Sequence, residues 1–237
     1  MRVTFLAHDG FLIELNTVCL LFDWWKEPIP PLPDKPLLVL ISHRHEDHFN
    51  PEVFTLAERK ADIQFLLGSD FHLLSRNLEK WRLTPEAAAK CRRCGKHDVF
   101  QPLPAVTVET FPSTDEGVAW MVTAEDKAIF HAGDLNWWHW AEEGDAWNRN
   151  MEANFKRYTE PLRGRRADLA MLPLDPRLES GGDLGPDYFL GLMDVRRFFP
   201  MHQWDHFEFT DEFLKRYPQF APITVKIHHN LETFQLD

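Results

Sequence analysis

The chain has 237 residues, and its 26 Lys and Arg stand against 37 Asp and Glu for a formal net charge of −11. This length can bury a substantial core, and hydrophobic residues at 44% exclude a disordered chain, so we expect one domain over residues 1–237. The acidic balance disfavours nucleic acid as a partner, because phosphates repel a negative surface.

Short apolar runs bounded by turn residues predict β-strands along most of the chain. The run at 37–41 is apolar at every position, which is typical of a strand buried on both faces. The apolar run at 198–200 is expected to end at Pro200, because proline cannot donate a hydrogen bond to a neighbouring strand. The expected strands lie at 3–7, 11–15, 18–22, 37–41, 63–67, 106–111, 118–122, 128–130, 169–172, 198–200 and 223–227.

Capping residues mark the starts of helices. Asn50 and Thr84 each precede a proline, which is a typical helix N-terminus, and Thr210 is expected to cap a third helix. These helices are expected to run to residues 60, 89 and 216, with further helices at 150–159 and 188–193. Strands and helices mix throughout, so the pattern predicts two β-sheets covered by helices.

The sequence contains no signal for export or for a membrane. The polar turn His8-Asp9-Gly10 interrupts the first apolar stretch, and no run of about 18 apolar residues follows. Three cysteines are too few for a disulfide scaffold. We therefore expect a cytoplasmic protein without membrane contact, and nothing in the sequence indicates its oligomeric state.

The loop after the apolar run at 37–41 is the most informative segment. It holds His43, His45, Asp47 and His48 within six positions. Imidazole nitrogens and carboxylate oxygens are ligands for Zn²⁺ and other divalent first-row ions. Alternate side chains point the same way, so His43 and His45 can bind one ion, and Asp47 and His48 a second ion beside it. A polar loop with incidental histidines is disfavoured, because four ligand-type residues share this spacing.

With this spacing the sequence resembles the metallo-β-lactamase superfamily, whose signature is His-x-His-x-Asp-His. The segment His8-Asp9-Gly10-Phe11 is similar to the opening hairpin of the branch related to L-ascorbate-6-phosphate lactonase. The resemblance extends over nearly the whole chain. It implies an α/β fold, a four-layer αββα sandwich with its metals at one edge of the sheets.

The same resemblance implies roles for residues elsewhere. Asp134 ends a segment similar to the family's strand that supplies the carboxylate bridging both ions, and His202 matches the late His ligand of the second ion. Asp23 lies in a turn that resembles the support of the metal loop, and His8 lies near it. Asp134 would hold the ions together, while Asp47 would orient the nucleophile.

One position departs from the family pattern. The family normally supplies a third His for the first ion shortly before the bridging Asp, yet no His occurs between His97 and His131. Asp115 is the candidate replacement, and Ser113 or Thr114 could act through a hydroxyl or a water. An oxygen ligand shifts preference from Zn²⁺, the favoured ion, toward Mn²⁺ or Fe²⁺. The alternative is that these three residues only form a turn.

Two divalent ions in such a site predict hydrolysis. Divalent cations lower the pKa of water, so hydroxide forms near neutral pH and attacks a carbonyl carbon or phosphorus. They also stabilise the charge that develops on the substrate oxygen. The sequence therefore predicts a metal-dependent hydrolase whose substrate is a small ester, lactone or phosphoester.

Other residues near the motifs are candidates for a substrate pocket. Trp137 and Trp138 follow the bridging Asp and could wall a pocket, or they could pack in the core. Arg177 could bind an anionic substrate group, although a solvated side chain is favoured. His206 could shuttle a proton because its ordinary pKa lies near neutrality, although a surface role is favoured.

Two further functions stay open from the sequence. One is a nuclease of the same superfamily, which the acidic charge disfavours. The other is a metal-binding module that has lost catalysis, which only the missing third His supports. A small-molecule substrate is the expected partner.

Overall fold

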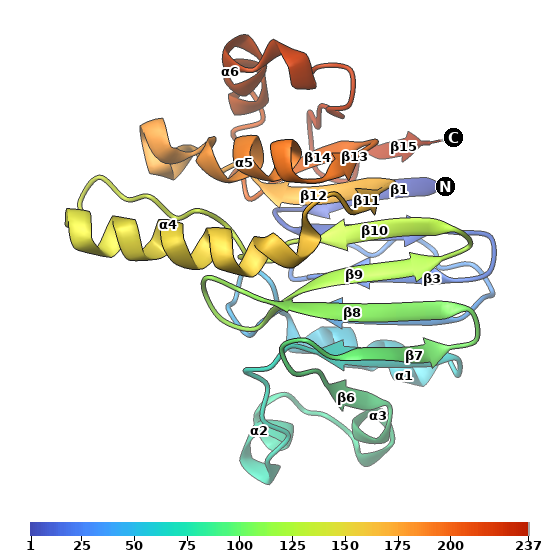
Figure 1. Cartoon of the computed structure of the whole chain (residues 1–237). Helices are drawn as coiled ribbons and strands as arrows, with labels where there is room; N and C mark the ends of the chain where they lie inside the picture. The colour runs from blue at the N-terminus through green and yellow to red at the C-terminus, as the bar shows by residue number, and fades with distance from the viewer. Residues whose placement is uncertain (237) are drawn as a thin grey trace.

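The computed structural model describes residues 1–236, and its first sheet contains seven strands in the order β15-β1-β2-β3-β4-β5-β6. The chain begins as an antiparallel meander, and from β3 onward neighbouring strands run parallel. The C-terminal strand pairs with the N-terminal strand, so the two ends of the chain lie side by side (Figure 1). The strands are β1 (Arg2–Ala7), β2 (Gly10–Glu14), β3 (Cys19–Phe22), β4 (Leu37–Ile41), β5 (Ile63–Leu67), β6 (Cys91–Arg93) and β15 (Thr233–Gln235).

The second sheet has six strands in the order β14-β12-β10-β9-β8-β7. Its first four strands along the chain are antiparallel, and the last three run parallel to one another. The strands are β7 (Val99–Leu103), β8 (Val106–Pro112), β9 (Val118–Ala124), β10 (Lys127–His131), β12 (Leu169–Pro173) and β14 (Phe198–Met201). A short parallel pair, β11 (Arg166–Ala167) and β13 (Asp194–Val195), lies apart from both sheets.

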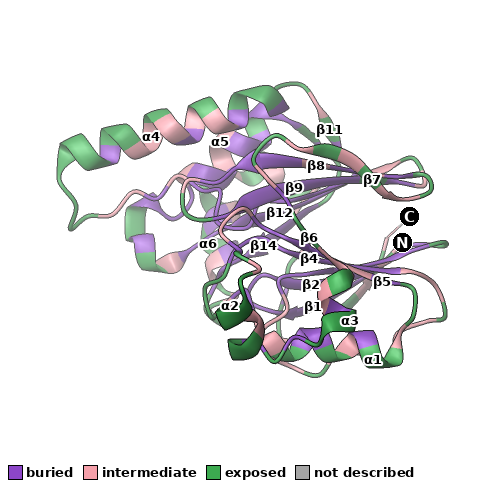
Figure 2. Ribbon diagram, turned by 90° about the horizontal axis from the view of Figure 1, so that it is seen from below, coloured by how far each residue is buried: buried purple, intermediate pink, exposed green. Residues whose placement is uncertain are grey.

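Helices cover the outer faces of both sheets, so the layers run helix, sheet, sheet, helix (Figure 2). This arrangement confirms the predicted α/β sandwich. The helices on the first sheet are α1 (Leu56–Arg59), α2 (Ser75–Lys80) and α3 (Pro85–Ala89), and those on the side of the second are α4 (Asp145–Thr159), α5 (Leu184–Leu192) and α6 (Phe209–Arg216). Short 3₁₀ segments lie at Pro51–Thr55, Glu160–Leu162, Pro176–Gly181 and Pro218–Phe220.

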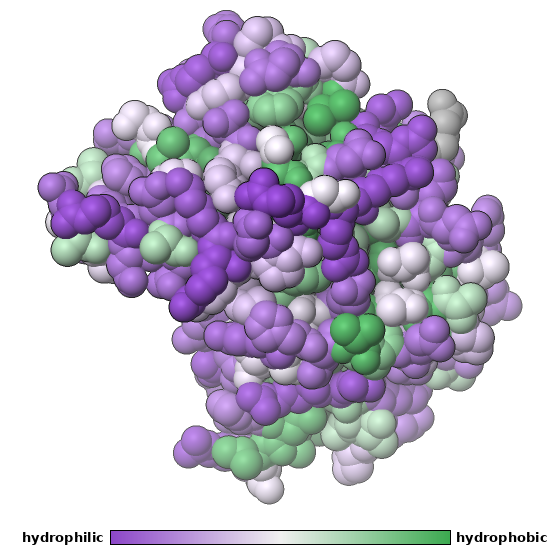
Figure 3. Space-filling model, viewed as in Figure 1, coloured by the Kyte–Doolittle hydropathy of each residue, from purple (hydrophilic) through white to green (hydrophobic). Residues whose placement is uncertain are grey.

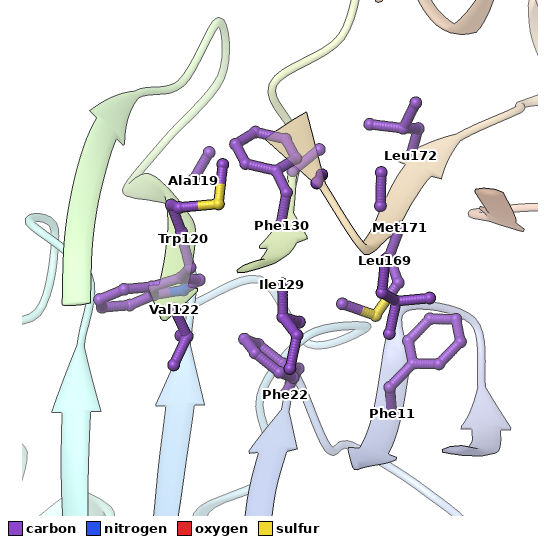
Figure 4. Close-up of a cluster of buried hydrophobic side chains, with 14 of the residues drawn as sticks. Phe11, Phe22, Ala119, Trp120, Val122, Ile129, Phe130, Leu169, Met171 and Leu172 are labelled. Atoms are coloured by element: carbon purple, nitrogen blue, oxygen red, sulfur yellow. The ribbon is translucent and has the colours of Figure 1, made fainter. Parts of the chain in front are cut away.

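The main core lies between the two sheets. Phe11 and Phe22 on the first sheet face Trp120, Ile129 and Met171 on the second, and each is almost completely buried (Figure 4). A second core lies between the first sheet and its helices. The central strand β4 contributes to both, as the uninterrupted apolar run at 37–41 predicts.

The two sheets end in polar loops at a common edge. Asp23 follows β3, and Asp134 lies just beyond β10. The loop at residues 42–48, here called the metal loop, follows β4. Asp175 and His202 follow β12 and β14 in the same way. The carboxyl ends of parallel strands meet at one edge of a sheet, so these residues converge there although they are far apart in sequence.

Several local predictions were wrong. Thr210 does not cap a helix; α6 begins at Phe209, and the Thr210 hydroxyl accepts a hydrogen bond from the Gln203 amide at 2.9 Å. Residues 223–227 form only an isolated bridge, through Thr224. The strand β14 continues past Pro200 to Met201. The helix expected after Asn50 divides into a 3₁₀ turn and the short α1. The helices expected at 150–159 and 188–193 begin earlier, at Asp145 and Leu184. The elements α2, β6, β7, β11, β13 and β15 were not predicted.

The face of the molecule seen in Figure 3 is mainly hydrophilic, and its hydrophobic residues are scattered in small groups. Across residues 1–236, no helix has both the length and the apolar character to cross a membrane.

Candidate metal centre

The metal loop is held in place by a buried carboxylate and by a close glycine contact. Asp23 is fully buried and accepts hydrogen bonds from the Ser42 amide at 2.7 Å and the Ser42 hydroxyl at 2.5 Å. Gly117 lies against the same residue with a φ of 69°, and a Cβ there would sit 1.9 Å from the Ser42 carbonyl oxygen. Only glycine fits this contact, which presses the β8–β9 turn onto the loop.

The first cluster of ligand atoms combines the loop with the β8–β9 turn. His43 Nε2 lies 2.9 Å from His45 Nδ1 and 3.6 Å from Asp134 Oδ2. His45 Nδ1 lies 3.4 Å from Asp115 Oδ2. Ligand atoms of these four residues all lie within 4.8 Å of one another. The proposed oxygen replacement for the missing imidazole, Asp115, is therefore within reach of the same ion as His43 and His45.

The second cluster is more deeply buried. His48 Nε2 lies 3.3 Å from Asp134 Oδ1 and 3.9 Å from Asp47 Oδ1. His202 Nε2 lies 3.5 Å from the same Asp134 oxygen. Asp134 thus directs one carboxylate oxygen toward each cluster. His8 and Asp9, from the β1–β2 turn, share the 4.8 Å group with His48 and His202.

These spacings fit divalent cations. Two ligand atoms held about 2.1 Å from one ion lie roughly 3.0 to 3.4 Å apart at octahedral or tetrahedral angles. The observed contacts run from 2.9 to 3.6 Å, apart from the longer 3.9 Å between His48 Nε2 and Asp47 Oδ1. His48 Nε2 and Asp134 Oδ1 are buried without a hydrogen-bond partner among the described residues, and such atoms need a compensating group.

The outer nitrogens of the buried histidines are fixed by carboxylates and a hydroxyl. His48 Nδ1 lies 2.9 Å from Asp23 Oδ2, and His202 Nδ1 lies 2.9 Å from Asp175 Oδ2. The Ser42 hydroxyl lies 2.9 Å from His43 Nδ1. Each contact turns Nε2 of that histidine toward the centre, the arrangement by which proteins orient metal-binding imidazoles. Sequence reasoning missed Asp175; its only signal was its place in a loop after a strand.

Burial and neighbouring charges perturb the pKa values in the metal-free protein. Burial raises the pKa of the Asp134 carboxyl and raises that of Asp23 to about 6. Burial lowers the pKa of His48 well below its ordinary value, and neighbouring cationic imidazoles lower it further. At His202, burial is outweighed by the carboxylates of Asp9, Asp134 and Asp175, which raise the pKa to about 9. The cluster therefore retains protons that a cation would displace.

A pocket of about 350 Å³ opens onto both clusters. His45, Asp47, Asp115, Asp134 and His202 form its polar floor. Its apolar wall consists of Trp138, Trp140, Trp147 and Met151, with Arg177 and Thr114 completing the lining. Such a mixture of apolar walls and few polar groups is typical of small-molecule sites.

The remaining candidates divide between the pocket and its surroundings. The Trp138 indole lines the pocket and donates to the Asp134 carbonyl at 3.0 Å, whereas Trp137 packs against Phe155 and is not among the lining residues. His206 is exposed beside Glu208 and does not line the pocket either.

Thr114 lies at the pocket, but its hydroxyl is already engaged. It donates to the Asn136 carbonyl at 2.7 Å and accepts from the Asn136 amide at 3.0 Å. These bonds tie the β8–β9 turn to the loop after β10. His8 is 5% exposed, and its Nε2 lies 3.4 Å from Asp47 Oδ2.

Arg177 belongs to both the pocket and the support of His202. Its guanidinium binds Asp175 through Nε and Nη2, at 3.0 and 2.6 Å from Oδ2. The same group lies 4.5 Å from the centre of the Trp204 ring, a cation–π distance. The side chain remains 44% exposed, so it can also meet a ligand in the pocket.

Comparison with known proteins gives a family match. Residues 2–146 match the family model described as "Beta-lactamase superfamily domain". A curated relative, a UPF0173 metal-dependent hydrolase from Desulforamulus reducens, is 37% identical over 67 residues, which cover 27% of this chain and 29% of the relative. The chain thus spans under a third of that relative's length.

Solved structures share the fold at low sequence identity. Igni18, a metallo hydrolase from the hyperthermophilic archaeon Ignicoccus hospitalis, aligns with a TM-score of 0.64 and 16% identity, over 100% of this chain and 99% of that one. CmlA, a diiron beta-hydroxylase from Streptomyces venezuelae, aligns with a TM-score of 0.64 and 10% identity, over 99% of this chain and 54% of that one.

Proposed function

We propose that this chain, which belongs to the metallo-β-lactamase superfamily, is a metal-dependent hydrolase whose centre cleaves a small ester, lactone or phosphoester with two divalent ions. The observation that carries the proposal is the position of Asp134. Its two carboxylate oxygens lie 3.6 Å from His43 Nε2 and 3.3 Å from His48 Nε2, at the floor of the pocket.

Each ion has a candidate set of ligands. His43, His45, Asp115 and Asp134 would hold the first. His48, His202, Asp134 and Asp47 would hold the second. Bound divalent cations supply Lewis acidity that polarises the scissile oxygen and makes water more acidic.

The protein's own groups orient the reactants. Asp47 lines the pocket, its side chain is 24% exposed, and its Oδ2 lies 3.4 Å from His8 Nε2, so the carboxylate can accept a hydrogen bond from a water and orient it. The indole of Trp138 fixes the Asp134 loop and walls the pocket, which excludes bulk water on that side.

The pocket also supports a small, partly apolar substrate with a negative group. Trp140, Trp147 and Met151 offer flat or flexible apolar surface, and Arg177 places a cation at the rim. We propose Arg177 as the anchor for that group. The finer resemblance, to the L-ascorbate-6-phosphate lactonase branch, agrees with a small anionic substrate, and we retain it as part of the proposal.

The proposed ions are Zn²⁺, which the histidines favour, with Mn²⁺ or Fe²⁺ as alternatives that the carboxylates favour. The fold neighbour CmlA is a diiron enzyme. Elemental analysis of the purified protein tests the number and identity of the ions directly.

The activity test uses metal-loaded protein and a substrate panel of p-nitrophenyl esters, lactones and bis-p-nitrophenyl phosphate. We expect turnover of at least one class, and His43→Ala should abolish it by removing a ligand. The matched control is His72→Ala, since His72 is exposed and is not among the residues of either cluster. Wild-type protein that binds ions but cleaves none of these bonds would contradict the proposal. Salt-dependent RNA binding would instead favour the nuclease alternative.

A further inference from the structure

Asp9 has a buried carboxylate that the proposed reaction leaves without a role. It lies in the turn between β1 and β2, and its side chain has no exposed surface. Neither carboxylate oxygen has a hydrogen-bond partner among residues 1–236. An ionised carboxylate in such a position is strongly destabilising unless a positive charge compensates it.

A buried histidine nitrogen close to this carboxylate is itself an electron-pair donor. Asp9 Oδ2 lies 3.2 Å from His48 Nε2. Because Asp23 occupies His48 Nδ1 at 2.9 Å, the proton of the neutral ring is on Nδ1 and the Nε2 lone pair faces Asp9. Two electron-pair donors at this distance repel each other unless a cation or a proton lies between them.

The distance matches that of a proposed ligand pair, His48 and Asp134. Asp9 lies 3.2 Å and Asp134 lies 3.3 Å from the same His48 nitrogen, and both values fit two ligands on one ion. Asp47 lies farther from that nitrogen, at 3.9 Å, and does not belong to the compact group of His8, Asp9, His48 and His202.

The turn that carries Asp9 is fixed by two hydrogen bonds from other strands. The Gly133 amide donates to His131 Nδ1 at 3.1 Å, so His131 Nε2–H donates to the Asp9 carbonyl at 2.8 Å. The His202 amide donates to the His8 carbonyl at 3.3 Å, which ties the turn to the end of β14. The backbone of Asp9 is thereby held between two strands that carry other candidate ligands.

We propose that Asp9 is a ligand of the second metal ion, an inference that rests on the proposed metal-dependent function. The second ion then has carboxylates from Asp9 and Asp134 beside the imidazoles of His48 and His202. Oxygen-rich sites favour Mn²⁺ and Fe²⁺ relative to Zn²⁺. Asp47 is then not needed as a ligand, and its carboxylate can face the pocket and orient a water.

The test compares metal binding by wild-type protein and Asp9→Asn, a variant that keeps the shape of the side chain and removes its charge. Metal-free protein is titrated with Mn²⁺ and with Zn²⁺ by calorimetry, and bound equivalents are counted by elemental analysis after gel filtration. We expect wild type to bind two equivalents. Asp9→Asn should keep the first and bind the second at least about tenfold more weakly, with the larger loss for Mn²⁺.

A matched control is Asp168→Asn, because Asp168 is also buried but pairs with Arg166 and Arg196 instead of the histidines. Its metal affinity should stay at the wild-type value. Thermal unfolding of the metal-free variants separates a structural role. A ligand role leaves metal-free Asp9→Asn about as stable as wild type, because the Asp9 carboxyl makes no hydrogen bond among residues 1–236 that the substitution would remove.

Two results would overturn the assignment of Asp9 alone: two equivalents bound by Asp9→Asn with affinities within about twofold of wild type, or a loss of metal-free stability without a loss of affinity. Wild-type protein that binds no ion would overturn the proposed function as well. If Asp9→Asn does not fold, anomalous diffraction from Mn²⁺-loaded wild-type crystals decides. An Asp9 oxygen within about 2.5 Å of the ion supports the assignment, and one beyond that distance refutes it.

Discussion

Asp175 offers the sharpest test of how the protein supports its buried histidines. Its Oδ2 accepts from His202 Nδ1 at 2.9 Å and from the Arg177 guanidinium at 2.6 Å, while its Oδ1 accepts from the Arg177 amide at 2.9 Å. In Asp175→Asn one of these oxygens becomes an NH₂ group, which faces a donor in either orientation. At least one buried donor is then left without an acceptor.

The magnitude follows from the pKa of this carboxyl. Burial alone would raise it, but the bonds from His202 and Arg177 lower the pKa to about 2 from an ordinary value of 3.8. That difference corresponds to about 2 kcal/mol, in the range of about 1–3 kcal/mol expected for an unsatisfied buried donor. For a chain of this size we expect the melting temperature of metal-free Asp175→Asn to fall by about 4–8 °C.

The pH dependence of stability tests independently that the Asp175 carboxylate stabilises the folded protein. Because the folded pKa is depressed, Asp175 stabilises wild type fully above about pH 4, and this stabilisation is lost as the pH falls toward 2. The melting curves of wild type and Asp175→Asn, followed by circular dichroism, should therefore converge over that interval. The control is Glu179→Gln, an exposed acid in the same loop, which should melt like wild type.

The same substitution should weaken metal binding about 10- to 100-fold, because His202 loses the partner that orients it. A variant that melts within 1 °C of wild type at pH 7 and binds Mn²⁺ normally would refute the role given to Asp175.

Three further predictions concern substrate binding in the pocket, packing against the metal loop, and the protons released when a metal ion binds. Arg177→Gln should raise KM for anionic esters about fivefold more than KM for neutral esters, as steady-state kinetics on paired substrates will measure. Gly117→Ala should lower the free energy of unfolding by about 3 kcal/mol or more, because it adds a Cβ 1.9 Å from a carbonyl oxygen at a residue with positive φ. The control is Gly191→Ala, in a helix with open space around the residue, which should not lower the melting temperature. Metal affinity should rise from pH 6 to 9, since the raised pKa values of Asp134 and His202 mean that a cation displaces protons, and calorimetry in buffers of different ionisation enthalpy will detect that release.

The sequence predicted the candidate ligands within one loop better than the candidate ligands that lie far apart in the chain. His43, His45, Asp47 and His48 are close in sequence, so their spacing alone indicates shared ligands. Asp134 and His202 could be placed only through the family resemblance, because no local pattern shows that β10 and β14 end at the same edge.

Other predictions failed because the direction of a side chain decides which residues it contacts. Trp137 and Trp138 are adjacent, and the sequence could not tell which lines the pocket; the structure turns Trp138 toward it and Trp137 toward Phe155. The helix cap at Thr210 had the right residue type, yet its hydroxyl bonds to Gln203. In both places tertiary contacts override a correct local preference.

The charges at the centre bear on how many ions it holds. The candidate carboxylates are Asp9, Asp47, Asp115 and Asp134, which together carry −4 when ionised. One divalent cation would leave two negative charges uncompensated, partly in a buried site where isolated charges are strongly disfavoured. Two divalent cations balance the four carboxylates. The excess of acidic over basic residues in the chain is thus concentrated in part at the proposed metal centre, and it supports the proposal of two ions.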